Sequence, residues 1–240
     1  MENYQPPTLL FTNHLETIYP ALLRSVPGIQ YERERITTTD HDFLDLDWLK
    51  QGSKKLVIIS HGLEGSTDRA YIKGMAKVFF TNGFDALAWN YRGCSGEMNC
   101  NLRFYHSGAT DDLDFVVSHA AALGYAEINL IGFSLGGNLT LKYAGEQATK
   151  LNPVIKKIAT FSVPLDLRAS CEKISAPSNW MYSNRFLKNL KKKVADKAKL
   201  IPELDASELP NIKTLLAFDN TYTAPLHGFR DALDYYNQCS

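Results

Sequence analysis

The chain has 240 residues, with 26 Lys and Arg against 26 Asp and Glu, so its formal net charge is zero. This length suits one large domain or two small ones, and 45% hydrophobic with 22% charged residues exclude a disordered, collagenous or coiled-coil protein. A neutral chain also lacks the basic footprint of a general nucleic-acid binder, so no nucleic-acid partner is expected.

The cysteines and the N-terminus give expectations about compartment. Four cysteines (Cys94, Cys100, Cys171, Cys239) form no C-x-x-C pair and no metal-type spacing, which predicts reduced thiols in a cytoplasmic protein. The first residues, MENYQPPTLLFTNH, carry an acid where a secretory signal has bases. No stretch approaches 18 apolar residues, so no membrane span is expected.

Hydrophobic periodicity predicts the elements in chain order. Residues 1–28 are irregular apart from a short helix near 18–23, and an acidic turn at Asp40 and Asp42 suggests a hairpin between two β-rich runs. The predicted strands are 31–38, 43–49, 56–60, 85–90, 127–133 and 154–163; the predicted helices are 68–82, 110–123 and 135–147. The alternation from residue 56 to 163 predicts an α/β fold with a mostly parallel sheet.

The character of the chain changes after Pro164. Residues 168–210 are polar, helical in places and strongly basic between Arg185 and Lys199, without a buried-strand pattern. This segment is expected to form a helical cap on the carboxyl edge of the sheet, and 230–238 to form one more helix.

The most specific local signal is Gly132-Phe133-Ser134-Leu135-Gly136, a G-x-S-x-G sequence. A predicted strand precedes it and a predicted helix follows at once, as a nucleophile elbow requires. Flanking glycines let the backbone turn sharply around an exposed serine. The helix N-terminus presents free amides to a developing oxyanion. The alternative is a glycine-rich turn that happens to contain serine.

A second loop, His61-Gly62-Leu63-Glu64-Gly65, follows the strand at 56–60. In a serine hydrolase this loop supplies the second oxyanion donor, so the amides of Leu63 and Leu135 are the candidate oxyanion hole. His61 is expected to order the loop by hydrogen bonding, although a catalytic base at this place is the alternative.

Several ordered motifs together resemble one family. They are HLETIYPALL (14–23), HGLEGS (61–66), NYRGCSGE (90–97), GFSLGG (132–137), YHSGATDDL (105–113) and TAPLHGF (223–229). The chain resembles the YheT-like branch of the α/β-hydrolase superfamily, of the AB-hydrolase family 4 type, from about Pro6 to its last residue. The resemblance implies a serine carboxylic-ester hydrolase with core 1–167 (arm 1–30), cap 168–228 and a return helix of the core at 229–240. Ser134 would be the nucleophile; Arg92, Cys94 and His106 are expected to order loops.

The acid and base of a catalytic triad are not evident. The family pattern places them after a seventh and an eighth strand, whereas this sequence stops at DALDYYNQCS, so it is expected to be C-terminally truncated, with the last two strands missing. A substitute triad of Ser134, Asp166 and His227 respects the chain order, with Asp219 as another acid. His227, however, lies in a family segment that accompanies the usual histidine, which favours a structural role.

Two functions stay open at this point. The first is a serine esterase or lipase-like enzyme acting on a small-molecule or lipid acyl ester, with no cofactor or metal expected. The second is a truncated or degenerate hydrolase core without turnover, which serves as a binding or interaction module or is an incomplete fragment. The basic stretch 185–199 could make a weak membrane-surface contact, or it could pack an apolar stripe in the cap with its lysines in solvent.

Overall fold

The core of the protein is a six-stranded sheet in the order β1-β2-β4-β3-β5-β6. The computed structural model describes residue 5 and residues 7–240. β1 and β2 form an antiparallel hairpin, β2 pairs antiparallel with β4, and the other neighbours are parallel. The strands are β1 (Glu32–Thr37), β2 (Phe43–Leu49), β3 (Lys55–Ser60), β4 (Asp85–Asn90), β5 (Glu127–Phe133) and β6 (Ile155–Phe161). The predicted α/β fold with a mostly parallel sheet is confirmed.

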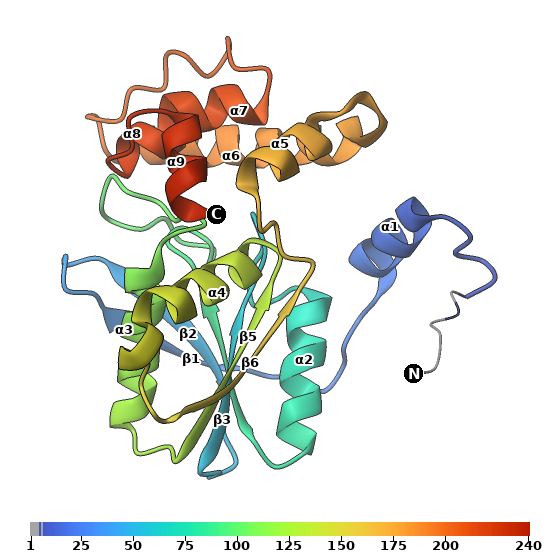
Figure 1. Cartoon of the computed structure of the whole chain (residues 1–240), viewed down its shortest axis with the longest axis vertical. Helices are drawn as coiled ribbons and strands as arrows, with labels where there is room; N and C mark the ends of the chain where they lie inside the picture. The colour runs from blue at the N-terminus through green and yellow to red at the C-terminus, as the bar shows by residue number, and fades with distance from the viewer. Residues whose placement is uncertain (1–4, 6) are drawn as a thin grey trace.

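Helices cover both faces of this sheet (Figure 1). Alternate residues of β3 supply the two faces, since Leu56 and Ile58 pack in the cluster with α3 and α4, whereas Val57 and Ile59 pack against α2. The helices of the core and its arm are α1 (Asn13–Leu23), α2 (Ala70–Thr81), α3 (Thr110–Ala122) and α4 (Leu135–Gln147), followed by the short 3₁₀ turn η1 (Ala148–Lys150).

A helical cap lies above the carboxyl ends of the parallel strands (Figure 1). Leu187, Val194, Leu204 and Phe218 of this part of the chain belong to a hydrophobic cluster distinct from that of the sheet, which Phe104 from the segment between β4 and α3 also joins. The elements after β6 are α5 (Leu167–Ser175), η2 (Pro177–Asn179), α6 (Trp180–Ala198), α7 (Leu215–Phe218), the π-helical turn η3 (Asp219–Thr223), α8 (Ala224–Leu226) and α9 (Ala232–Cys239).

Helix α9 joins the cap to the core. Tyr235 and Tyr236 pack in a cluster with Leu167 at the start of α5. The carbonyl of Cys239 accepts a hydrogen bond of 2.6 Å from Asn138 Nδ2 on α4. The segment predicted as a return helix of the core therefore contacts both layers.

The basic helix α6 packs its apolar stripe inside the cap. Val194 is 1% exposed and belongs to the cap cluster. The expectation of solvated lysines is wrong at two positions. The Lys197 side chain is fully buried and donates to the carbonyls of Asn101 and Arg103, and burial lowers the pKa of Lys197 to about 7. The Lys193 side chain is only 12% exposed, at the site described below.

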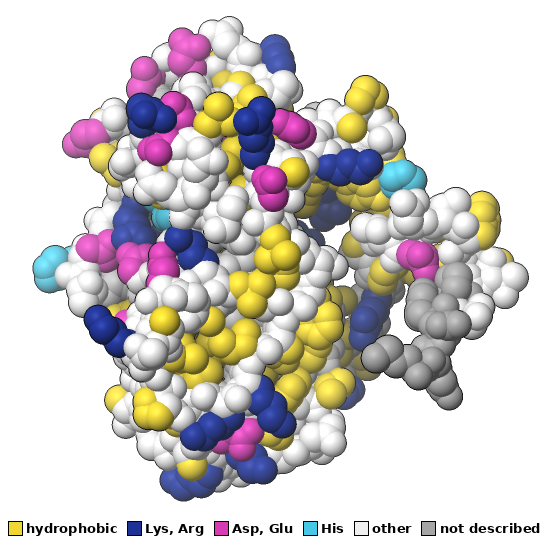
Figure 2. Space-filling view, in the orientation of Figure 1, with side chains coloured by type: hydrophobic (Ala, Val, Ile, Leu, Met, Phe, Trp, Pro, Cys, Tyr) yellow, Lys and Arg dark blue, Asp and Glu magenta, His cyan; other side chains and the backbone are white. Residues whose placement is uncertain are grey.

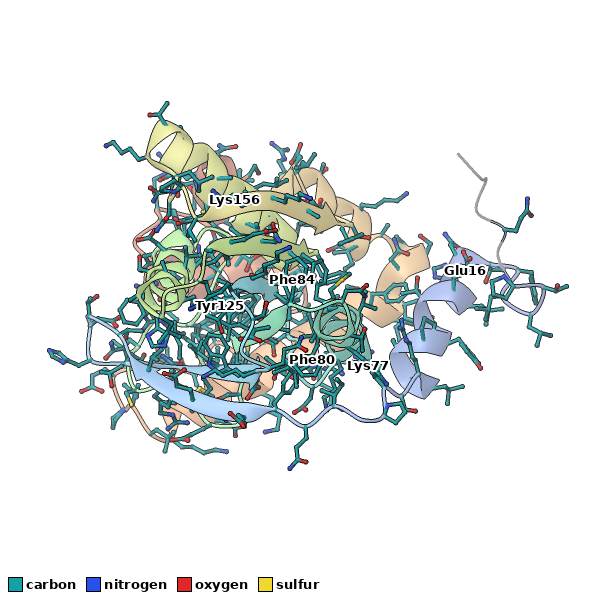
Figure 3. The ribbon with its side chains drawn as sticks, turned by 90° about the horizontal axis from the view of Figure 1, so that it is seen from below. Glu16, Lys77, Phe80, Phe84, Tyr125 and Lys156 are labelled. Atoms are coloured by element: carbon teal, nitrogen blue, oxygen red, sulfur yellow. The ribbon has the colours of Figure 1, made fainter. Side chains whose placement is uncertain are left out.

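Strand β6 forms one edge of the sheet, with β5 as its neighbour on one side only. Figure 2 shows hydrophobic side chains on the face of the core where β6 runs, and Phe161 is 43% exposed. Lys156 and Lys157 are exposed on this edge, and charged residues protect edge strands from pairing with other chains. Lys156 stands on this outer strand in Figure 3.

Helix α1 stands to one side of the core, beyond α2. In Figure 3, Glu16 on α1 and Lys77 on α2 mark these two neighbouring helices. The Lys77 ammonium donates a 2.8 Å hydrogen bond to the carbonyl of Pro27, which ties the connection after α1 to the core. Within residues 5 and 7–240, no helix combines the length and hydrophobicity needed to cross a bilayer.

Buried aspartates give the hairpin of β1 and β2 a dependence on pH. Burial would raise the pKa of Asp45, but its ion pair with Arg35, 2.8 Å long, outweighs this and holds the pKa below its usual value. For Asp42, hydrogen bonds from Asn99 and from backbone amides overcome burial in the same way. Both carboxyls therefore bind protons less readily in the folded chain than in the unfolded chain.

We expect the free energy of unfolding to fall as the pH drops below about 4, the usual pKa of an aspartate. The contribution of these carboxyls is complete above the unfolded pKa and is lost as the pH falls through the lower folded pKa. Urea unfolding at stepped pH measures it. Asp45→Asn serves as the matched variant and should lose less stability between pH 5 and pH 3; an equally steep loss would remove Asp45 as a source of the effect.

Candidate active site

Ser134 lies on the sharp turn between β5 and α4. Its backbone has φ 53° and ψ −120°, a left-handed conformation that is costly for a residue with a side chain. The Ser134 amide donates a 2.8 Å hydrogen bond to the carbonyl of Phe161 at the end of β6. Strain of this kind is held at functional sites by the surrounding structure, and here it raises the serine above the sheet as a nucleophile elbow does.

The glycines of the turn are required by close packing. A Cβ atom at Gly132 would collide with the carbonyl oxygen of Gly136. A Cβ at Gly136 would meet the carbonyl of His61 and would lie 2.6 Å from the Tyr91 hydroxyl oxygen. The G-x-S-x-G sequence therefore lets β5, α4 and the loop after β3 approach one another.

Replacing Gly136 with alanine is expected to destabilise the protein by about 2 kcal/mol or more, because backbone atoms that cannot move aside occupy the space of the new methyl group. Gly145 in the same helix is the matched control, since nothing lies within 4 Å of its Cβ position. Gly145→Ala should stabilise the helix by about 0.5–1 kcal/mol. Thermal or urea unfolding measures both; equal effects of the two variants would contradict this reading.

Two backbone amides beside Ser134 have no acceptor. The amide of Leu135 is the first of α4, and the amide of Leu63 belongs to the loop after β3. In the described part of the chain, neither donates a hydrogen bond to another protein group. The loop passes directly against the serine, because a Cβ at Gly62 would lie 3.2 Å from Ser134 Cβ. Free amides at a helix N-terminus are suited to stabilise an oxyanion.

The His61 side chain holds the loop after β3 in place through hydrogen bonds. Nδ1 lies 2.8 Å from the carbonyl of Gly62, to which it donates, and Nε2 accepts from the amide of Tyr91. The Tyr91 hydroxyl in turn donates to the carbonyl of His61 at 2.6 Å. Burial lowers the pKa of His61 to about 3, so the imidazole stays neutral. Both ring nitrogens are engaged, which gives His61 the loop-ordering role that its position predicted.

A buried cluster joins the same loop to the cap. Lys193 Nζ on α6 donates to Glu64 Oε1 at 2.7 Å and to Cys94 Sγ at 3.1 Å. Tyr105 completes the cluster, since its hydroxyl donates to Glu64 Oε1 and accepts from the Glu64 amide. The Glu64 side chain is 7% exposed and its backbone φ is 52°. This cluster fixes the residue next to Leu63, and with it the candidate oxyanion hole.

An apolar cavity of about 180 Å³ opens beside Ser134, between sheet and cap. We call it the acyl cavity. Asp219 makes part of its lining polar: the Asp219 carboxylate accepts hydrogen bonds of 2.6 Å from Thr223 and from Tyr236, and burial raises the Asp219 pKa. The apolar walls include Leu135, Pro164, Leu167, Ile174, Phe186 and Leu215. Such a cavity suits an aliphatic chain.

The substitute triad of Ser134, Asp166 and His227 is not brought together. Asp166 caps α5, where its carboxylate accepts from the amide of Ala169 at 2.8 Å. His227 Nδ1 donates to the carbonyl of Thr223 at 2.6 Å, and Nε2 accepts from the amide of Phe104 at 3.2 Å. Both side chains therefore hydrogen bond to backbone groups. Because Nε2 of His227 already accepts a hydrogen bond, it is not available to accept the Ser134 proton.

The remaining motif residues contact neighbouring loops. His106 lines the acyl cavity, but its Nδ1 accepts from the amide of Gly108, so in the neutral ring Nε2 carries the proton. Burial lowers the pKa of His106 to about 3. None of the six histidines hydrogen bonds to Ser134, and no metal-binding cluster of His, Cys, Asp or Glu occurs, within residues 5 and 7–240.

Sequence reasoning missed Glu64, Tyr105 and Lys193 as supports of the site. A signal for Lys193 was present, because helical spacing from Phe186 places it on the apolar face of α6. Its partner Glu64 is 129 residues away in the sequence, and no local pattern indicates that contact.

Comparisons with known proteins agree with this architecture. A family described as "alpha/beta hydrolase fold" matches residues 55–196. The chain is 32% identical over 239 residues to YheT of Escherichia coli strain K12, whose name assigns it provisionally to the esterases; the match covers 96% of this chain and 70% of YheT. It is 29% identical to the bovine phospholipase ABHD3, covering 100% of this chain and 61% of that protein.

Other relatives and solved structures extend the comparison. The monoacylglycerol lipase of Saccharomyces cerevisiae is 27% identical over 78% of this chain and 44% of its own length. The α/β hydrolase GrgF of Penicillium superposes with a TM-score of 0.50 at 17% identity, covering 77% of this chain and 57% of GrgF, which shows the fold alone. The chain spans 61–70% of the length of YheT and ABHD3. With the family match and the identity to YheT, the chain belongs to the α/β-hydrolase superfamily, in the branch that includes YheT.

Proposed function

We propose that the chain is a serine hydrolase that cleaves carboxylic esters with lipid-like acyl groups. The observation that carries the proposal is the strained Ser134 at the mouth of an apolar cavity, beside two amides that lack acceptors. Relatives named as a phospholipase and a monoacylglycerol lipase support an acyl ester as the substrate class.

In the proposed reaction, Ser134 Oγ attacks the ester carbonyl and forms a tetrahedral intermediate with a negative charge on the former carbonyl oxygen. The amides of Leu63 and Leu135 stabilise this charge, and the positive end of the α4 dipole adds to the effect. The bond from the carbonyl carbon to the alcohol oxygen then breaks, the proton lost by the serine passes to that oxygen, and the alcohol leaves an acyl-enzyme behind. The acyl chain occupies the acyl cavity. Water subsequently hydrolyses the acyl-enzyme and regenerates the serine.

A second candidate function is an acyl-binding or interaction module without turnover. It is favoured by one observation: in the described chain, no histidine is placed to accept the Ser134 proton. A serine site without its base retains the part of catalysis that comes from the oxyanion hole and from binding.

A fluorophosphonate probe and a short-chain p-nitrophenyl ester separate the two functions. Multiple turnovers of the ester, together with a probe adduct located on the peptide containing Ser134 by mass spectrometry, support the hydrolase. A Ser134 adduct with at most a single turnover supports the binding module. No adduct at Ser134 would refute the proposed nucleophile.

A further inference from the structure

A second, larger cavity of about 490 Å³ lies on the other side of Ser134. We call it the outer chamber. It is bounded by α1, the loop after β3, the start of α2, the end of β6 and α6. Leu63, Ser134 and Phe186 line both this chamber and the acyl cavity. The candidate nucleophile therefore sits at the junction of two spaces, of which, within the described residues, only the outer chamber is lined by arginines.

Three arginines line the outer chamber, each from a different element. Arg24 follows α1, Arg69 precedes α2, and Arg185 lies on α6. Within residues 5 and 7–240, none of the three forms an ion pair with a carboxylate, whereas every other arginine of the chain does so: Arg33, Arg35, Arg92, Arg103, Arg168 and Arg230. The arginines without an acidic partner are thus gathered around a single cavity.

The charge of these arginines is not balanced within the chamber. Glu64 is the acidic residue in its lining, and its carboxylate is already paired with Lys193 at 2.7 Å. Arg69 donates a hydrogen bond of 3.3 Å to the carbonyl of Glu64, which uses no negative charge. The side chains around the chamber therefore carry a net positive charge and have guanidinium groups free to bind an anion.

Guanidinium groups bind phosphate through paired, charge-assisted hydrogen bonds. A phosphate monoester carries a charge of about −2 and three acceptor oxygens, which suits several arginines converging from different elements. An ester bound with its acyl chain in the acyl cavity and its carbonyl at Ser134 directs its alcohol portion into the outer chamber.

We propose that the outer chamber binds a phosphate group on the alcohol portion of the ester, held by Arg24, Arg69 and Arg185. This inference rests on the proposed function in taking Ser134 as the reacting residue. The substrate class is then a phosphate-bearing acyl ester, either a lipid in a membrane surface or a soluble phosphate ester.

Binding by the wild-type chain is measured by calorimetric titration with octyl phosphate, below its micelle concentration, and with the neutral octyl glucoside. We expect octyl phosphate to bind at least about tenfold more tightly than octyl glucoside, because hydrogen bonds between charged groups are stronger than those between neutral groups. The combined Arg24→Gln, Arg69→Gln and Arg185→Gln variant should lose this preference. Arg168→Gln, which changes an exposed arginine of the cap outside the chamber, should retain it.

A second arm identifies the source of the phosphate. Co-sedimentation is compared between vesicles of phosphatidylcholine and vesicles that also contain phosphatidic acid. Arginine-dependent binding to the acidic vesicles alone supports a membrane lipid, and arginine-dependent binding of monomeric octyl phosphate supports a soluble ester. The single variant Arg185→Gln, on the surface of α6, gives the same test with little risk to folding.

Equal binding of octyl phosphate and octyl glucoside, with no preference for acidic vesicles, would overturn the inference. So would a preference for octyl phosphate that survives in the triple variant. The readout is binding of molecules that are not carboxylic esters, so it does not depend on turnover. If the chain binds octyl phosphate but gives no adduct at Ser134, the proposed hydrolase function is contradicted, whereas the proposed phosphate site is not.

Discussion

Replacing Ser134 with alanine is expected to abolish labelling by a fluorophosphonate and to reduce ester turnover to the background rate. The reagent reacts with a serine oxygen that lies beside oxyanion donors, and the Ser134 hydroxyl adjoins the free amides of Leu63 and Leu135. Loss of a serine nucleophile costs about 10³-fold or more in turnover where a complete triad is present. In-gel fluorescence and release of p-nitrophenol measure the two effects.

Ser183→Ala provides the matched control for this experiment. Ser183 lies on α6 outside both cavities, and its hydroxyl donates to the carbonyl of Trp180. The control variant should be labelled and should turn over ester as the parent does. Persistent labelling of Ser134→Ala at the parent's rate would show that the reactive serine lies elsewhere in the chain.

Replacing Arg92 with alanine is expected to lower the free energy of unfolding by about 3–5 kcal/mol, the usual effect of removing one partner from a buried ion pair. The guanidinium is 2% exposed and binds Asp42 at 3.0 Å and Asp112 at 2.7 Å, both of them buried. Without Arg92, the negative charges of these two carboxylates remain in the interior without the positive charge that neutralises them. Urea unfolding monitored by tryptophan fluorescence measures the loss.

The control for Arg92→Ala removes an arginine from an ion pair that is exposed to solvent. Arg168 and Glu172 on α5 are 63% and 66% exposed, so Arg168→Ala should change stability by less than about 0.5 kcal/mol. Arg92→Lys should fall between the two, because an ammonium keeps the charge but cannot reach several carboxylates with a planar fork. A loss below about 1 kcal/mol for Arg92→Ala would mean that the cluster does not support the fold as its geometry implies.

The strands and core helices could be predicted from the sequence because their signals are local. The continuous apolar runs at β3 and β5 and the amphipathic spacing of α2 each depend on a few neighbouring residues. The nucleophile elbow could be recognised for the same reason. Only glycine fits at positions 132 and 136, and both positions lie within one five-residue motif.

The supports of the site could not be predicted in the same way. Lys193 reaches Glu64 across a cap–core interface whose register depends on the packing of all the cap helices. The three arginines of the outer chamber come from elements that are far apart in the sequence. Periodicity shows which face of a helix is buried, but it does not show which residue of a distant element that face will meet.

The hydrogen bond from the Ser134 amide to the carbonyl of Phe161 connects the turn to the last residue of β6. An edge strand is among the first segments to open in local unfolding, because a neighbour restrains it on one side only. When the end of β6 frays, the backbone of Ser134 loses an acceptor and the strained turn can relax. The lifetime of the reactive geometry is therefore coupled to the opening of β6, and ligands that hold the end of this strand in place prolong it.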